Sequence, residues 1–191
     1  MAKRIAIDFD EVLFPLFTEY TRYYQKKVNR PVKVPLKHPY CFGTAIGTSD
    51  DEAQEKLQEF FRSEEHRKLT PIAGSQRVIE KLKSDGWEMS LVTARPTTAS
   101  HETEYLLEKF FPNVFQKFIY CNGHTSYYVP KYKVCEHLGA KWLIDDNYKH
   151  CLECLDVGMG VVNFVGNPVY PWCDETKISA RNWDQVYDFI A

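Results

Sequence analysis

The stretch Ile5-Ala6-Ile7-Asp8-Phe9-Asp10-Glu11-Val12 decides the fold, because an apolar run ends there in two acids separated by one residue. The apolar run predicts a buried strand from Arg4 to Asp8. Residues i and i+2 of an extended chain point to the same side, so Asp8 and Asp10 can converge on one point. Two such carboxylates repel each other unless a cation lies between them, and oxygen ligands suit Mg²⁺. An acid that merely ends a strand and caps the next turn is an equally good interpretation of this motif alone.

Short apolar runs alternate with helical segments along most of the chain. We predict further strands at residues 87–93, 115–120, 141–145 and 160–164, and helices at 75–84, 100–110, 131–138 and 148–156. Asn182 can cap a final helix that begins near it. Apolar strands that alternate with helices indicate a parallel sheet covered on both faces. The predicted class is therefore α/β, with a Rossmann-like doubly wound parallel sheet.

The alternation breaks between the first strand and Pro71. Two helices are predicted there, at residues 16–28 and 49–68, joined by a loop rich in proline. Ligands of open parallel sheets bind beyond the carboxyl ends of the strands, so this insertion is expected to cover the site as a cap. The predicted boundaries are 1–13 and 70–191 for the α/β core domain and 14–69 for the helical cap.

The composition excludes several classes of function. The 191 residues include 24 Lys and Arg against 26 Asp and Glu, and a net charge of −2 gives no reason to expect a nucleic-acid partner. No signal-peptide pattern and no apolar run of membrane-spanning length is present, so we expect a cytoplasmic protein with no membrane partner. The six cysteines are expected to be free thiols. Cys151 and Cys154 form a C-x-x-C pair without a second pair of ligands nearby, so a zinc or redox site is not expected.

A second acidic motif, Ile144-Asp145-Asp146-Asn147, also ends an apolar strand. A helix N-cap explains this motif on its own, because Asp and Asn favour that position. Two acidic clusters at the ends of inner strands would face one crevice of a parallel sheet, however, which is harder to attribute to capping. Asp8, Asp10, Asp145 and Asp146 are therefore the candidate metal ligands.

Thr93 and Lys131 are candidates for holding a phosphate group. The sequence Leu91-Val92-Thr93-Ala94-Arg95-Pro96 places a hydroxyl at a strand end, where it and the next backbone N–H groups can bind phosphate oxygens. A helix cap is the preferred interpretation of Thr93 taken alone. Lys131 begins the helix before the Asp145 strand and could neutralise a phosphate and a carboxylate. Lys133 is the alternative, and most lysines are simply solvated.

The D-x-D motif, the threonine, the lysine and the Asp-Asp pair, in this order, resemble the haloacid dehalogenase superfamily of phosphotransferases. The resemblance covers nearly the whole chain. Response-regulator receivers use the same residue types in another order and lack a cap after the first strand. Within the superfamily, the small cap, T-A-R-P at 93–96, I-D-D at 144–146, Trp172 and the pair Asn182-Trp183 look like the deoxyribonucleotidase-like subgroup.

The resemblance implies a Mg²⁺-dependent phosphohydrolase in which the Asp8 carboxylate attacks phosphorus and forms an aspartyl-phosphate. Asp10 would act as general acid for the leaving oxygen and then as general base for water. The metal ion would be held by Asp8, the backbone carbonyl of Asp10 and Asp146, with Asp145 close behind. Glu11 departs from the Gly or Asp that often follows the second acid, and it could alter metal affinity or help to orient the cap.

The same resemblance assigns the residues around the phosphate. Thr93 and the Ala94 amide would hold phosphate oxygens, and Lys131 would balance the negative charge. Arg95 would contact the phosphate or a substrate edge, with a surface salt bridge as the alternative. The implied substrate is a small phosphomonoester such as a nucleoside monophosphate.

Aromatic residues follow helical spacing in the first cap helix, at Phe17, Tyr20, Tyr23 and Tyr24. Such a stripe could stack on a base, but packing inside the cap is the preferred interpretation. Two other functions are compatible with the sequence. One is a catalytically silent binding or regulatory protein, and the other is a phosphatase of nucleic-acid ends, which the mild acidity disfavours. A homodimer is also compatible with the sequence.

Overall fold

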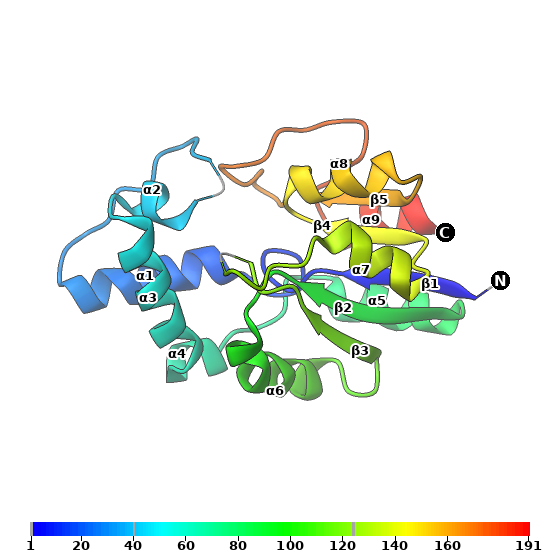
Figure 1. The fold of residues 1–191 in the computed structure, drawn as a ribbon, viewed down its shortest axis with the longest axis horizontal. Helices are drawn as coiled ribbons and strands as arrows, with labels where there is room; N and C mark the ends of the chain where they lie inside the picture. The colour runs from blue at the N-terminus through cyan, green and yellow to red at the C-terminus, as the bar shows by residue number, and fades with distance from the viewer. Residues whose placement is uncertain (1, 40, 124) are drawn as a thin grey trace.

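The computed structural model describes residues 2–39, 41–123 and 125–191. Residues 1 and 124 of the predicted core range and residue 40 of the predicted cap range lie outside the described residues. Figure 1 shows a sheet flanked by helices, with a further group of helices beyond one end of it. Among the helices that the structure describes, none is long and apolar enough to cross a membrane.

The described residues form one sheet of six parallel strands in the order β3-β2-β1-β4-β5-β6 (Figure 1). The strands are β1 (Lys3–Ile7), β2 (Trp87–Thr93), β3 (Phe115–Tyr120), β4 (Trp142–Asp145), β5 (Gly160–Phe164) and β6 (Ser179–Ala180). In β1, Ile5 pairs with Met89 on one side and with Trp142 on the other. The strand order reverses between β1 and β4, and ligands of doubly wound sheets bind at this switch point. The predicted fold class is confirmed.

Helices cover both faces of the sheet, as the alternation of side chains along each strand requires. One face is covered by α5 (Ser75–Ser84), α6 (Ser100–Phe110) and α9 (Trp183–Ile190), and the other by α7 (Lys131–Leu138) and α8 (Tyr148–Asp156). In β1, Ile5 and Ile7 pack into the first core, whereas Ala6 packs into the second. This period of two buries Ile5, Ala6 and Ile7, the half of β1 that leads to the site.

The helices inserted between β1 and β2 lie beyond the carboxyl ends of the strands (Figure 1). These cap helices are α1 (Leu16–Val28), α2 (Phe42–Ile46), α3 (Asp50–Phe61) and α4 (Glu64–Arg67). Ser49 and Ser63 are the N-caps of α3 and α4, because each side chain accepts a hydrogen bond from a backbone N–H three residues later. The two ends of the insertion lie side by side, since the Ile72 N–H donates to the Leu13 carbonyl at 2.8 Å.

Three elements differ from the prediction. Helix α2 forms inside the segment expected to be a loop, and Gly47 ends it with a left-handed φ of 72°. The single helix expected at 49–68 is two helices, because Ser63 interrupts the first and caps the second. Strand β6 has two residues, too few to leave a pattern in the sequence.

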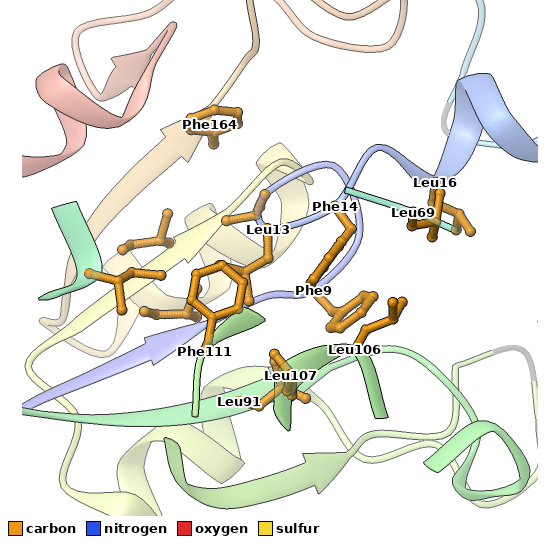
Figure 2. Close-up of a cluster of buried hydrophobic side chains, with 14 of the residues drawn as sticks. Phe9, Leu13, Phe14, Leu16, Leu69, Leu91, Leu106, Leu107, Phe111 and Phe164 are labelled. Atoms are coloured by element: carbon orange, nitrogen blue, oxygen red, sulfur yellow. The ribbon is translucent and has the colours of Figure 1, made fainter. Parts of the chain in front are cut away.

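The loop that follows β1 is anchored in the core by Phe9, Leu13 and Phe14 (Figure 2). The rings of Phe9 and Phe14 stack with their centroids 4.7 Å apart, and Leu106 and Leu107 of α6 lie in the same cluster. Phe9 is fully buried and stands between Asp8 and Asp10 in the sequence. Its burial therefore fixes the backbone that carries both acids.

The tyrosines of the aromatic stripe pack inside the cap. Tyr20, Tyr23 and Tyr24 are buried, and the Tyr20 hydroxyl donates to the Ala53 carbonyl of α3 at 2.7 Å. The packing interpretation is confirmed for these three residues. Phe17 packs on both sides of the boundary, because its ring centroid lies 5.6 Å from that of Phe42 in the cap and 5.2 Å from that of Trp172 in the core domain.

Candidate active site

Asp8 and Asp145 meet where β1 and β4 end next to each other. The Asp8 N–H donates to the Ile144 carbonyl at 3.0 Å, so the loop after β1 leaves the sheet beside the end of β4. Asp145 is the last residue of β4, and Asp146 follows it. The two acidic motifs therefore converge at the switch point of the sheet, as their positions at strand ends predict.

Asp8, Asp145 and Asp146 form a compact acidic group. Each offers a carboxylate oxygen, and these three oxygens lie within 4.8 Å of one another. All three residues are buried. Asp146 Oδ2 accepts a hydrogen bond from Trp172 Nε1 at 2.8 Å. Asp146 Oδ1 is buried with no hydrogen-bond partner among the described residues, and a buried oxygen in that condition is costly unless a cation takes it.

This group fits a hard divalent cation. Carboxylate oxygens are the ligands that Mg²⁺ prefers, and the orphaned Asp146 Oδ1 supplies an unused lone pair. Asp8, Asp145 and Asp146 would hold such an ion. The Asp10 carboxylate lies outside this group and pairs with Arg95. The Asp10 backbone carbonyl, which the family resemblance adds to the metal ligands, stays a prediction.

Lys131 supplies the fixed positive charge of the site. It is the first residue of α7 and is fully buried. Its Nζ lies 2.6 Å from Asp145 Oδ2 and 2.9 Å from Asp8 Oδ1. Lys133, the alternative in the sequence, is exposed, so Lys131 is the lysine that reaches the acids.

The electrostatics of the acidic group are set by burial and by Lys131. Burial raises the pKa of Asp8 to about 6, against the lowering effect of Lys131. Burial also raises the pKa of Asp146 well above its ordinary value, reinforced by the charges of Asp145 and Asp8. Burial opposes the charge of Lys131, but Asp145 and Asp8 outweigh it and hold the Lys131 pKa well above the usual range. Three buried acids with one lysine thus lack positive charge, which a divalent cation would supply.

Thr93 and Ala94 lie at the carboxyl end of β2. Thr93 is fully buried, and its Oγ1 accepts a hydrogen bond from the Arg95 N–H at 3.2 Å. The Ala94 carbonyl accepts from the Gly123 N–H at 2.8 Å. A Cβ at Gly123 would lie only 3.0 Å from this carbonyl, so the close approach of the two loops favours glycine.

Arg95 forms an internal ion pair. Its side chain is 1% exposed and pairs with Asp10, with Nη2 at 2.8 Å from Asp10 Oδ1 and Nε at 3.0 Å from Oδ2. Arg95 also lines the cavity between the cap and the strand ends, so its contact with the phosphate or a substrate edge stays a prediction. The alternative was a salt bridge at the surface, whereas the observed one is internal.

Glu11 lies outside the acidic group and attaches the first cap helix. It is buried with a left-handed φ of 58°, and its Oε1 accepts a hydrogen bond from the Phe17 N–H at the start of α1. Its carbonyl accepts from the Tyr170 hydroxyl at 2.8 Å. Burial raises the pKa of Glu11 to about 8. These contacts agree with the expectation that Glu11 helps to orient the cap.

Sequence reasoning missed Asn163 and His66. The Asn163 Nδ2 donates to the carbonyls of Asp145 and Asp146 at 3.1 and 3.0 Å, which fixes the backbone of both acids. A polar residue inside the apolar run of β5 was a signal that could have found it. His66 contacts Arg95 from the cap, and no local pattern in the sequence indicates this contact.

A cavity of about 740 Å³ lies between the cap and the strand ends. One wall is the face of α3 that carries Gln54, Leu57, Gln58 and Phe61. The opposite wall consists of loops that follow β2 and β3, and it includes Ala94 and Asn122. Among the described residues that line this cavity, Asp10 and Arg95 are the only charged ones, and they neutralise each other.

A first prediction concerns metal binding: relative to the parent, the free energy of unfolding of Asp146→Asn should differ in one direction without divalent cations and in the other with Mg²⁺. Asp146→Asn is expected to be at least as stable as the parent without divalent cations, because it removes a buried carboxylate that repels Asp145 and Asp8. At Mg²⁺ about 100 times its Kd, the parent should gain about 2.7 kcal/mol and the variant far less. Urea titrations with EDTA and with Mg²⁺ measure both effects. Asp156→Asn, at an exposed acid, is the control, and an equal Mg²⁺ gain in all three proteins would contradict the site.

Comparison with known proteins places the chain in a family. The sequence model described as "5' nucleotidase, deoxy (Pyrimidine), cytosolic type C protein" matches residues 2–191. A Bacillus cereus protein described as "Putative nucleotidase" is 24% identical over 121 residues, which span 61% of this chain and 64% of that protein.

Solved structures share the fold. A protein from Clostridium acetobutylicum described as "a predicted phosphatase" superposes with a TM-score of 0.70 at 17% identity, covering 98% of this chain and 97% of the other. A haloacid dehalogenase-like hydrolase from Streptococcus pneumoniae superposes with a TM-score of 0.70 at 12% identity, covering 100% and 99%. The match over residues 2–191 shows that the chain belongs to the cytosolic type C 5'-nucleotidase family.

Proposed function

We propose that the protein hydrolyses a phosphomonoester, with Asp8 as nucleophile, Mg²⁺ as cofactor and a nucleoside monophosphate as substrate. The observation that carries the proposal is the buried group of Asp8, Asp145 and Asp146 around Lys131 at the switch point of the sheet. A metal ion bound by the acids would supply positive charge to the phosphoryl oxygens. Phosphoryl transfer needs mainly positioning and charge stabilisation, which such a group provides.

The first half of the reaction transfers the phosphoryl group to the protein. An Asp8 carboxylate oxygen attacks phosphorus, and the bond between phosphorus and the ester oxygen breaks. Asp10 first takes up a proton from solvent and then gives it to the departing oxygen, so the leaving group is released as an alcohol. Lys131 stays paired with Asp8 and Asp145 and balances the negative charge. Thr93 and the backbone N–H of Ala94 bind phosphate oxygens.

The second half regenerates the nucleophile. Asp10, now ionised, takes a proton from a water molecule as its oxygen attacks phosphorus. The bond between phosphorus and the Asp8 oxygen breaks, which releases inorganic phosphate and restores the carboxylate. The buried position of Asp8, 4% exposed, limits the access of other nucleophiles to the intermediate.

The cavity beside Asp10 favours an uncharged leaving group. Its lining offers amide groups from Gln54 and Gln58 and an apolar surface from Leu57 and Phe61. The cationic Arg95 in this lining is already paired with Asp10, so the described lining residues offer no free positive charge to a second phosphate. A nucleoside, which is neutral and carries hydrogen-bonding groups, suits this lining. The description of the family names a 5' nucleotidase, which supports the same substrate class.

The test is phosphate release from a panel of esters, with Mg²⁺ and with EDTA. We expect Mg²⁺-dependent release from 4-nitrophenyl phosphate and from nucleoside monophosphates. A nucleoside diphosphate or a sugar bisphosphate should show a kcat/KM lower by about 10-fold or more, because its second phosphate would be buried without a partner. Metal binding without release from any ester would instead indicate a silent binding protein. Equal rates on monophosphates and bisphosphates would contradict the proposed leaving-group site.

A further inference from the structure

The Arg95 guanidinium connects three parts of the molecule. Nε and Nη2 bind the Asp10 carboxylate in the loop after β1. Nη1 donates to Thr103 Oγ1 of α6 at 2.9 Å and faces His66 Nε2 of α4 at 3.0 Å. A core loop, a core helix and a cap helix are thus joined through one side chain. A planar guanidinium that makes such directional contacts fixes the orientation of its carboxylate partner.

Aromatic rings hold this guanidinium from two sides. Its carbon lies 4.1 Å from the centroid of the Phe9 ring and 4.4 Å from the centroid of the Phe61 ring. Phe9 belongs to the core and Phe61 to α3 of the cap, so the guanidinium sits at the contact of the two layers. Stacking on two desolvated rings stabilises a cation and removes its freedom to swing toward a ligand.

His66 is built into the aromatic packing of the cap. It is fully buried, and its ring meets those of Phe60 and Phe61 edge-on, with centroids 5.5 and 5.7 Å away. Burial, with a smaller effect of Arg95, lowers the pKa of His66 to about 2, so the ring is neutral at physiological pH. A neutral ring with its proton on Nδ1 accepts from Arg95 at Nε2. The cap therefore contributes a fixed hydrogen-bond acceptor rather than a charge.

Asp10 keeps access to the cavity while Arg95 holds it. The Asp10 side chain is 12% exposed and lines the cavity, whereas the Arg95 side chain is 1% exposed. We infer that Arg95 and His66 are positioning residues, which fix the Asp10 carboxylate toward the leaving group only while α4 is seated against the core. This inference rests on the proposed function, because it assigns a proton transfer to Asp10. A displacement of about 1 Å of such a group is enough to reduce a rate strongly.

The test compares His66→Phe with His66→Gln. Phenylalanine keeps a ring in the aromatic packing but removes the acceptor, whereas the glutamine oxygen can still accept from Arg95. The measurement is kcat/KM over a series of esters, from 4-nitrophenyl phosphate to phenyl phosphate and an alkyl phosphate. Proton donation matters most for the alkyl ester, because its leaving oxygen is the most basic.

We expect His66→Phe to lower kcat/KM on the alkyl ester by about 10-fold or more, but on 4-nitrophenyl phosphate by less than about threefold. His66→Gln should keep most of the kcat/KM that His66→Phe loses on the alkyl ester. His101→Phe makes the same change at an exposed histidine and should leave the whole series unchanged. A uniform loss across the series, or none, would overturn the inference, since a merely structural role does not depend on the leaving group.

Arg95→Lys provides a second test if His66→Phe does not fold. Lysine keeps the charge but loses the paired contact with Asp10 and the stacking between the rings. We expect kcat/KM of Arg95→Lys to fall more steeply than that of the parent as the leaving oxygen becomes more basic. A dependence equal to that of the parent would reject the inference. The parent protein separates the two proposals. If it releases no phosphate from any ester, the proposed function fails, whereas an active parent with leaving-group behaviour unchanged in the variants removes only the role of Arg95 and His66.

Discussion

Replacing Asp8 with asparagine is expected to abolish phosphate release, by about 10⁴-fold or more in kcat, the scale seen when a covalent nucleophile is removed from other enzymes. The amide oxygen of asparagine is a poor nucleophile and cannot form the aspartyl-phosphate. Lys131 keeps its ion pair with Asp145 in the variant, so the local structure retains its charge balance. The measurement is release of inorganic phosphate from 4-nitrophenyl phosphate and from nucleoside monophosphates in the presence of Mg²⁺.

The fold of Asp8→Asn should survive. Asparagine matches aspartate in shape and removes a buried charge that repels Asp145 and Asp10. Circular dichroism and thermal unfolding should therefore resemble those of the parent, and Asp156→Asn should keep both fold and activity. Substantial turnover by a well-folded Asp8→Asn protein would show that another group attacks phosphorus, and the proposed function would be withdrawn.

Replacing Lys131 with methionine should produce the largest loss of stability. The lysine is fully buried between Asp8 and Asp145, and its removal leaves buried carboxylates without a cation. Breaking a buried ion pair in this way costs about 3–5 kcal/mol. In a chain of this length, that corresponds to a fall in Tm of roughly 6–20 °C. Urea unfolding in EDTA measures the loss of unfolding free energy directly.

Magnesium should restore part of the stability of Lys131→Met. A divalent cation bound by the acids replaces some of the missing positive charge, so the difference from the parent should shrink when Mg²⁺ is added. Lys133→Met is the matched control two residues away, at an exposed position. Its unfolding free energy should stay within about 0.5 kcal/mol of the parent. If the two substitutions lowered the free energy of unfolding equally, Lys131 would not be the cation that stabilises the buried acids.

The convergence of the acidic motifs could be predicted from the sequence, because it depends only on strand ends. Asp8 follows an apolar run, and Asp145 closes another. Parallel strands present their carboxyl ends at one edge of the sheet, so the two acids had to approach each other once β1 and β4 became neighbours. The bounds of α1 and α5 followed for similar reasons, since periodicity and a helix stop such as Gly86 are local signals.

The surroundings of Arg95 could not be predicted in this way. Its partners come from the loop after β1, from α4 and from α6, and nothing in the sequence near position 95 records them. An arginine beside a threonine expected to bind phosphate therefore suggested a substrate contact. Helix α2 was missed for a different reason. It has five residues within a proline-rich segment, where local propensity favours a loop and the packing of the cap decides.

The hydrogen bond between Ile72 and Leu13 has a consequence for how this architecture can diversify. The chain leaves the sheet and returns to it at one spot, so the inserted helices add length without altering the order or register of any strand. A longer, shorter or unrelated insertion could be joined at the same two residues, while the acids on β1 and β4 kept their places. Selection for a new substrate would then act mainly on the inserted stretch of the gene, with His66 as the inserted residue that the proposed positioning of Asp10 ties to the common chemistry.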